Sequence, residues 1–271
     1  MNSEEILLEK SKIRHRLVSR GKNYSWIFRS IEVYKKIDYK KADLLENYYY
    51  LMRFIDDVAD GQAQLPASFF SEEEYVDTKI NFSKTLSNPK DFADYMMMRS
   101  FQSAYDLGID ISLETSNILE SMLFDSKRKG KFIIFDEQQL DLHYDMLDIK
   151  GCISGALKIM GEDSKLTKDI LPLGKASRIY YDTRDIREDI SQGFVNISKE
   201  DLSSFNVNID DILRNDIKRL MMHRATVGVA KLLEYHRPKD MKFLTKLTLI
   251  FGYEHPSKKY FNNVLKHNFY K

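Results

Sequence analysis

The spacing of apolar residues is the feature of this sequence that most restricts its fold. Through nearly all of the chain, apolar side chains recur three or four residues apart, which is the period of one face of an α-helix. Only 11 glycines and 5 prolines interrupt the 271 residues, and no segment shows strand alternation followed by a hairpin turn. We therefore predict one all-α domain covering residues 1–271 and built from about ten helices.

Capping residues mark both ends of a long predicted helix. Asp38 is a typical N-cap residue, and Gly61 is suited to end the helix that runs over 39–60. Serines at or near capping-box spacing start two further segments, at 71 and at 112. The remaining helices are expected at 3–21, 23–37, 71–86, 89–107, 112–127, 136–161, 165–190, 208–236, 241–253 and 257–267, with a basic loop at 125–134.

Charge and composition exclude several classes of function. The chain carries 42 basic and 41 acidic residues, so there is no overall positive field and we expect no nucleic-acid partner. A single cysteine, Cys152, excludes an intrachain disulfide and a multi-cysteine zinc site. No segment has the apolar core of a signal peptide or the roughly 18–20 apolar residues of a membrane span. We expect a cytoplasmic protein that can touch a membrane peripherally, with residues 246–253 as the candidate contact.

The segment LMRFIDDVADG, residues 51–61, places three aspartates within five residues. Successive residues turn by roughly 100° around a helix, which puts Asp57 off the face that the other charged residues share. Stacked carboxylates repel one another, and Mg²⁺ is the expected neutralising ion because it binds one or two carboxylates together with substrate phosphates. The residues on the shared face are Tyr49, Arg53, Asp56 and Asp60.

A second acidic cluster follows in RIYYDTRDIRED, residues 178–189. The same arithmetic places Arg178, Asp182, Asp185 and Asp189 on one helix face. Either cluster alone is more often a solvated surface, but two of them predict a clamp in which carboxylates hold Mg²⁺ and arginines bind the diphosphate. Core packing explains most of the neighbouring tyrosines, and His143 and His223 are interpreted as ordinary helix residues, since no histidine pair has i, i+4 spacing.

Both clusters resemble the motifs of a known family. YYLMRFIDDVAD is similar to the first aspartate-rich motif of the squalene/phytoene synthases, Y-x-x-x-R-x-x-D-D-x-x-D, and residues 173–202 are similar to the second. The order and spacing hold from about residue 20 to about residue 205. The resemblance implies an isoprenoid synthase fold with helices around a central cavity. It also implies Mg²⁺-dependent, head-to-head condensation of two C15 or C20 prenyl diphosphates (farnesyl or geranylgeranyl diphosphate), with release of diphosphate.

The resemblance also assigns roles to individual residues. Arg53 and Arg184 would contact diphosphate or brace the acidic residues, Tyr49 would lie near the reacting centre, and a prenyl chain would pass Gly151 and Gly155. The candidate metal ligands are Asp56, Asp57, Asp60, Asp182, Asp185 and Asp189.

The chain departs from the family pattern around the second motif. Tyr181 and Arg178 stand where the family has asparagine and glutamine, and residues 194–198 replace the family's R-I-Y-L-P. We expect Asp182 to take over the role of the missing asparagine as a metal ligand, with Arg178 offsetting its charge and binding phosphate. These departures indicate an altered second diphosphate site.

Two alternatives to head-to-head condensation stay open. An altered second site would admit a small non-prenyl acceptor, or the prenyl cation would cyclise, after the same ionisation step. A non-catalytic assembly or binding protein of the same fold is the other alternative. The intact acidic clusters argue against it, because a binding protein has no need to keep like charges stacked.

Overall fold

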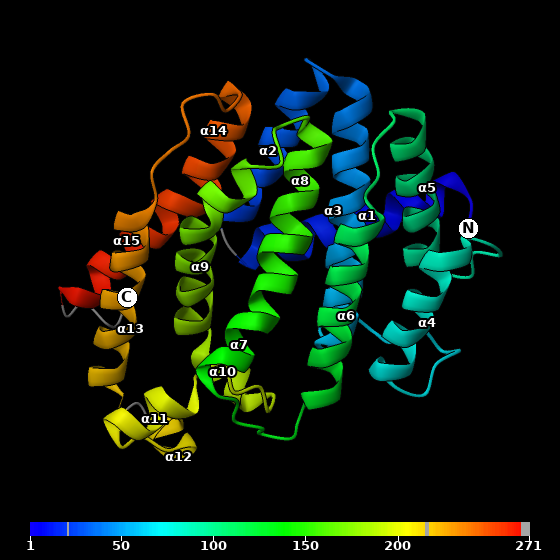
Figure 1. Cartoon of the computed structure of the whole chain (residues 1–271). Helices are drawn as coiled ribbons and strands as arrows, with labels where there is room; N and C mark the ends of the chain where they lie inside the picture. The colour runs from blue at the N-terminus through cyan, green and yellow to red at the C-terminus, as the bar shows by residue number, and fades with distance from the viewer. Residues whose placement is uncertain (21, 215–216, 267–271) are drawn as a thin grey trace.

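The computed structural model describes residues 1–20, 22–214 and 217–266, and within these ranges the chain is helical and has no β-strand (Figure 1). The helices in chain order are α1 (Ser3–Arg20), α2 (Lys22–Lys35), α3 (Tyr39–Ala59), α4 (Glu72–Thr85), α5 (Phe92–Asp106), α6 (Ser112–Arg128), α7 (Glu137–Tyr144), η1 (Asp145–Ile153), α8 (Ser154–Met160), α9 (Leu166–Arg184), α10 (Ile186–Ser191), α11 (Lys199–Phe205), α12 (Ile209–Arg214), α13 (Lys218–Glu234), α14 (Phe243–Leu249), η2 (Ile250–Glu254) and α15 (His255–Leu265). The elements η1 and η2 are π-helical.

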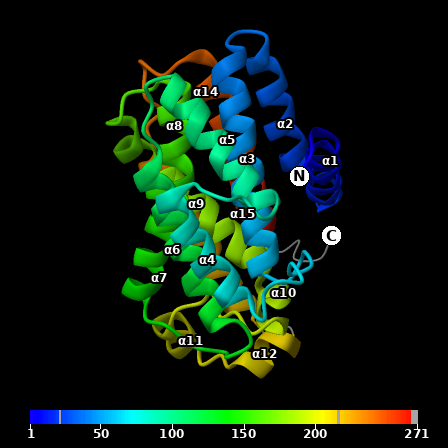
Figure 2. The same cartoon turned by 90° about the vertical axis from the view of Figure 1, so that its right-hand side faces the viewer.

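The long helices lie side by side along the molecule. Helix α9 packs against α13 on one side and η1 on the other, η1 packs against α6, and α3 packs against α5 (Figures 1 and 2). The short helices α10, α11 and α12 gather at one end, toward which α3 and α9 both run (Figure 1). This topology brings the C-terminal ends of the two helices that carry the acidic clusters to the same end of the bundle.

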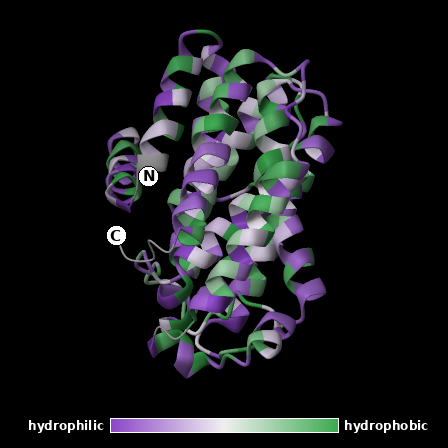
Figure 3. Ribbon diagram, turned by 90° about the vertical axis from the view of Figure 1, so that its left-hand side faces the viewer, coloured by the Kyte–Doolittle hydropathy of each residue, from purple (hydrophilic) through white to green (hydrophobic). Residues whose placement is uncertain are grey.

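Apolar residues alternate with polar ones along most helices, so each helix buries one side (Figure 3). The largest apolar cluster forms around α3, whose Tyr48, Leu51, Ile55 and Val58 are almost completely buried. Burial of this face fixes the rotation of α3. The opposite choice of face would place these apolar side chains in water.

Side-chain caps confirm two of the three helix starts that the sequence predicted. Asp38 accepts a hydrogen bond from the Lys41 backbone N–H at 3.1 Å. Ser71 accepts one from the Glu74 backbone N–H, also at 3.1 Å. The third helix does start at Ser112 as predicted, but Ser112 does not cap it: α6 has no side-chain cap, and Asp110 accepts from the backbone N–H of Ser112.

Several predicted helices are divided in the structure. The segment 136–161 is helical throughout but becomes π-helical in the middle, and 165–190 breaks at Asp185, where φ is −99° and ψ is 7°. The segment 208–236 forms α12 and α13, and residues 215–216 between them lie outside the described residues. Residue 267, at the end of the last predicted helix, also lies outside them. Helix α11 was not predicted. Its N-cap Ser198 accepts from the Asp201 backbone N–H at 3.0 Å.

The two glycines expected beside a prenyl chain serve close helix packing instead. A Cβ at Gly151 would lie 2.4 Å from Cγ1 of Ile118, and a Cβ at Gly155 would lie 2.9 Å from Cε1 of Tyr48. The space that these glycines leave is therefore filled by side chains of α6 and α3. This corrects the interpretation of the glycines as part of a chain-binding channel.

A buried lysine joins α4 to α5 and provides a test of the fold. Lys79 is fully buried, and its Nζ lies 2.6 Å from Asp91 Oδ2 and 2.7 Å from Asp94 Oδ1. Replacement of Lys79 by methionine leaves Asp94 buried without its cation, so we expect a loss of about 3–5 kcal/mol in the free energy of unfolding, measured in urea. The control is Lys84→Met on the exposed side of α4, and equal stability of the two variants would contradict this account.

Candidate active site

The two acidic clusters face each other at the end of the bundle. Burial raises the pKa of Asp60 well above its usual value, and the next contributions come from Asp56, on the same helix, and from Asp125 on α6. Asp189 of α10 raises it as well. Charges exert such effects only when they lie close together. We therefore define an acidic centre made of Asp56, Asp60, Asp125 and Asp189, together with Asp182, whose charge raises the pKa of Asp189.

The α3 side of this centre contains the residues that helical geometry placed on one face. Arg53 forms an ion pair with Asp56, with 2.7 Å between Nη1 and Oδ2, while burial raises the pKa of Asp56. Within the described residues, the Asp60 carboxylate has no hydrogen-bond or ion-pair partner, and the buried Tyr49 hydroxyl has none either. This side therefore presents one paired and one unpaired carboxylate.

Asp57 lies next to the acidic centre, where its charge contributes to the raised pKa of Asp56, but its own carboxylate is held by arginines. Its fully buried carboxylate accepts from Arg16 Nε at 3.0 Å and from Arg53 Nη2 at 3.1 Å, and Arg20 Nη1 lies 3.6 Å away. The contacts from Arg16 and Arg20 tie α1 to α3 through two guanidinium groups, and Arg53 belongs to α3 itself. A carboxylate with three cationic partners is poorly suited to bind a metal ion as well, so we correct the inclusion of Asp57 among the candidate ligands.

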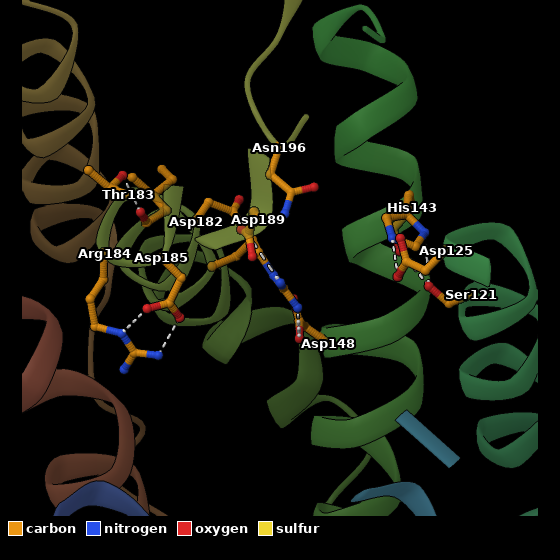
Figure 4. Close-up of polar contacts among 12 residues, drawn as sticks. Ser121, Asp125, His143, Asp148, Asp182, Thr183, Arg184, Asp185, Asp189 and Asn196 are labelled. Atoms are coloured by element: carbon orange, nitrogen blue, oxygen red, sulfur yellow. Dashed lines mark hydrogen bonds and ion pairs between the residues drawn. The ribbon is translucent and has the colours of Figure 1, made fainter. Parts of the chain in front are cut away.

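The second cluster is not the continuous ladder that a straight helix predicted. Because the helix breaks at Asp185, this residue turns toward Arg184, whose Nε donates to its Oδ1 at 2.6 Å (Figure 4). Arg184 also donates to the Tyr180 hydroxyl at 3.1 Å. Asp182, before the break, and Asp189, after it, lie close enough for the charge of Asp182 to raise the pKa of Asp189 (Figure 4). Asp185 still contributes to the raised pKa of Asp189, after burial and Asp182, although its own carboxylate is paired with Arg184.

Burial controls the ionisation of Asp182 and Asp189. It raises the pKa of Asp182 to about 6, against the opposing effects of Arg178 and Arg224, whose nearest nitrogens are 3.4 and 3.7 Å away. Burial, followed by the charge of Asp182, raises the pKa of Asp189 to about 7. The Asn196 side-chain amide donates to Asp189 Oδ2 at 2.9 Å and partly offsets this shift.

Arg178 lies between these carboxylates and the π-helix η1. Its Nε and Nη2 donate to the two oxygens of Asp148 at 2.7 and 2.9 Å, and its guanidinium lies 4.6 Å from the centre of the Tyr144 ring. The pairing of Arg178 with Asp182 across one helical turn, which the sequence suggested, is present. Arg178 is thus fixed beside the acidic centre by residues of two elements.

Sequence reasoning missed the contribution of α6. Asp125 was assigned to a loop and His143 to ordinary helix packing. In the structure, His143 Nε2 lies 3.1 Å from Asp125 Oδ2, and its Nδ1 lies 2.9 Å from the Ser121 hydroxyl (Figure 4). Burial alone would raise the pKa of Asp125, but His143 and Arg128 lower it, so this carboxylate is ionised. Asp125 and Arg128 are three residues apart and form an ion pair, as Arg53 and Asp56 do. This spacing is the sequence signal that could have identified Asp125 as a candidate site residue.

The arrangement of helices matches that of a solved enzyme. No family model and no curated protein matches the sequence. Among solved structures, the chain is similar to the crystal structure of a dehydrosqualene synthase in complex with ligand, with a TM-score of 0.66 and 13% sequence identity over 98% of each chain. The chain has the isoprenoid synthase fold. Dehydrosqualene synthase is a member of the squalene/phytoene synthase family, so the fold agrees with the resemblance of the two sequence motifs.

A cavity of about 240 Å³ adjoins the acidic centre in this isoprenoid synthase fold. It lies between α7 with η1, α9, α11 and α13, and Arg178, Asp182 and Asn196 form part of its wall. No residue of α3 lines it. Its lining contains six carboxylates and four lysine or arginine side chains, besides His223: Glu137, Asp141, Asp145, Asp148, Asp182 and Asp201, against Lys175, Arg178, Arg224 and Lys231.

The acidic centre fits a metal ion that is held jointly with phosphate. Its donors are carboxylate oxygens, which Mg²⁺ prefers, and Asp60 has no partner among the described residues. In this same part of the chain, no group of three or more acidic, histidine or cysteine side chains is arranged to hold a metal ion. Mg²⁺ usually keeps waters and substrate phosphates as ligands, so the donor set suits a metal–diphosphate complex better than a metal alone.

The candidate membrane contact is partly buried. In residues 246–253, Leu249 and Gly252 are buried, whereas Phe251 is 39% exposed and stacks on Trp26 with ring centroids 4.9 Å apart. Within the described ranges, no helix combines the length and the apolar character that crossing a bilayer requires. Peripheral contact through residues 246–253 stays a prediction.

Proposed function

We propose that this protein is a Mg²⁺-dependent prenyl diphosphate transferase, with head-to-head condensation of farnesyl or geranylgeranyl diphosphate as its default reaction. The supporting observation is the convergence of carboxylates from α3, α6, α9 and α10 on one acidic centre. The fold of a dehydrosqualene synthase agrees with this reaction class. The fold family is typically Mg²⁺-dependent.

The side chains of the acidic centre would drive ionisation of the allylic diphosphate. Asp56, Asp60 and Asp189 would hold Mg²⁺, which, when bound, neutralises the diphosphate as it leaves with the electron pair of the broken C–O bond. Arg53 would contact phosphate oxygens directly, since its Nε has no hydrogen-bond partner within the described residues. Tyr49 would face the prenyl cation and help to exclude water.

Arg178 and Asp182 are proposed to act at the boundary of the centre. Asp182 is 2% exposed and already has two arginine partners, so any contact with metal requires it to exchange one of them. Arg178 would supply positive charge near the diphosphate while Asp148 fixes its orientation. We keep Asp185 as a candidate ligand that must separate from Arg184 before it binds metal.

The cavity that adjoins the acidic centre favours a second candidate function, which is transfer of the prenyl group to a small non-prenyl acceptor. At about 240 Å³ the cavity is below the roughly 300–1,000 Å³ of typical ligand pockets. Its excess of carboxylates would repel a second diphosphate, attract a cationic molecule and leave a neutral one without repulsion. It shares Arg178 and Asp182 with the acidic centre, so an acceptor bound there would lie close to the ionising group.

A purely binding role is disfavoured by the energetics of the acidic centre. The pKa values of Asp56, Asp60 and Asp189 are all raised, because burial and neighbouring carboxylates oppose their ionisation. Such an arrangement destabilises the ligand-free fold at neutral pH. It is expected where a function requires bound cations.

Incubation with farnesyl or geranylgeranyl diphosphate and Mg²⁺ tests the proposal. We expect release of diphosphate that stops when Mg²⁺ is chelated, with the products identified by mass spectrometry. A C30 or C40 hydrocarbon supports head-to-head condensation, whereas an acceptor adduct or a cyclic product supports the second candidate. Absence of diphosphate release with both substrates, from folded protein, would contradict both candidates and favour the binding protein.

A further inference from the structure

A chain of hydrogen bonds runs from α6 to the acidic centre through a residue that follows α10. Arg128 donates to Asp125 Oδ1 through Nε at 2.7 Å and to Asn196 Oδ1 through Nη2 at 2.7 Å. Asn196 then donates through Nδ2 to Asp189 Oδ2 at 2.9 Å. One guanidinium group therefore connects two carboxylates of the centre, directly to Asp125 and through the amide to Asp189.

Arg128 is rigidly held. Its side chain is 5% exposed, and its guanidinium lies 5.1 Å from the ring centre of Phe194 and 5.6 Å from that of Phe124. It also donates to the Val195 carbonyl at 3.4 Å. These contacts leave Arg128 little freedom to follow a displaced Asn196, so the position of the amide is set by the fold.

The segment that carries Asn196 is fixed to the loop after α6. The Gly130 N–H donates to the Gln192 carbonyl at 3.0 Å, and the Phe132 N–H donates to the Gly193 carbonyl at 3.1 Å. Gly193 has a φ of +82°, and a Cβ there would lie 2.4 Å from the Gly130 Cα. This close approach requires glycine and holds the segment after α10 against α6.

We propose that Asn196 and Arg128 are positioning residues that orient Asp189 toward the metal–diphosphate complex. The bond from Asn196 engages Oδ2 of Asp189, and Oδ1 has no hydrogen-bond partner within the described residues, which leaves it available as a ligand. Asn196 lies in the segment 194–198 that departs from the resembled motif, so this support belongs to this chain. The inference rests on the proposed function.

The test is calorimetric titration of Mg²⁺ in the presence of inorganic diphosphate, with melting temperatures recorded in parallel. Loss of such supporting contacts to a metal ligand typically weakens metal binding roughly 10–100-fold. We expect Asn196→Leu to raise the Mg²⁺ concentration for half-saturation by this factor, and Asn196→Gln to recover part of the loss. The control is Asn81→Leu, which removes a similar bond to Asp77 (3.3 Å) on exposed α4 and should leave Mg²⁺ binding unchanged.

The outcomes separate the inference from the proposed function. If wild-type protein binds Mg²⁺ and diphosphate, and folded Asn196→Leu binds them equally well, the positioning role is wrong while the proposed function stands. If wild-type protein binds neither, the proposed function fails and the inference fails with it. Should Asn196→Leu not fold, Arg128→Lys is decisive. The lysine ammonium keeps the positive charge, but it lacks the separate guanidinium nitrogens that bind Asp125 and Asn196. Unchanged Mg²⁺ binding in that variant would overturn the proposal.

Discussion

Replacement of Asp60 by asparagine is expected to reduce diphosphate release roughly 100-fold or more, because a metal ligand contributes several kcal/mol to the stabilisation of the leaving group. The same change should stabilise the Mg²⁺-free protein. Burial and three neighbouring carboxylates raise the pKa of Asp60, so removing its charge relieves repulsion in the folded state. Each kcal/mol relieved would raise the melting temperature by roughly 2–4 °C. The measurements are a diphosphate-release assay and thermal unfolding in a chelator.

The opposite signs of the two effects make this prediction specific. A residue that only supports the fold would lose activity and stability together. Asp106→Asn is the matched control, since Asp106 is an exposed aspartate at the end of α5 and should change neither quantity. Near wild-type turnover in Asp60→Asn would show that Asp60 is not a metal ligand.

The stability of the Mg²⁺-free protein should fall as the pH rises from about 4 to about 7. In the folded state the pKa of Asp182 is about 6 and that of Asp189 is about 7, against an ordinary aspartate value of 3.8. Between these limits the folded protein binds more protons than the unfolded chain, so the free energy of unfolding decreases with increasing pH. Asp125, whose pKa is lowered, contributes its pH dependence at more acidic values, outside this range.

Comparison with a variant isolates this effect from the other ionisable groups. Asp189→Asn removes one of the two carboxylates, so the difference in unfolding free energy between variant and wild type should grow across this pH range. This difference is measured by urea unfolding in a chelator at pH 4.5, 5.5, 6.5 and 7.5, which covers the range in which Asp182 and Asp189 titrate in the folded protein. A constant difference would contradict the raised pKa of Asp189. Added Mg²⁺ and diphosphate should reduce the loss of stability at neutral pH.

The sequence alone was sufficient to predict the all-helical class, the start of α3 at Asp38 and the shared face of Arg53, Asp56 and Asp60. These features depend on local spacing, because capping bonds and helical faces involve residues within a few positions of one another. The same arithmetic placed Asp57 off that face, and its contacts with Arg16 and Arg53 agree with this. The two motifs also indicated the family whose fold the chain shares.

Only the tertiary structure decided which carboxylates meet. The break at Asp185 turns that residue toward Arg184 and leaves Asp182 beside Asp189, which a straight helix did not predict. Asp125 enters the acidic centre from α6, and neither its position nor its partner His143 follows from residues near it in sequence. The physical reason is that the ionisation of a buried carboxylate depends on desolvation and on charges contributed by separate helices. Both depend on how the helices pack, and the spacing of residues in the sequence does not predict them.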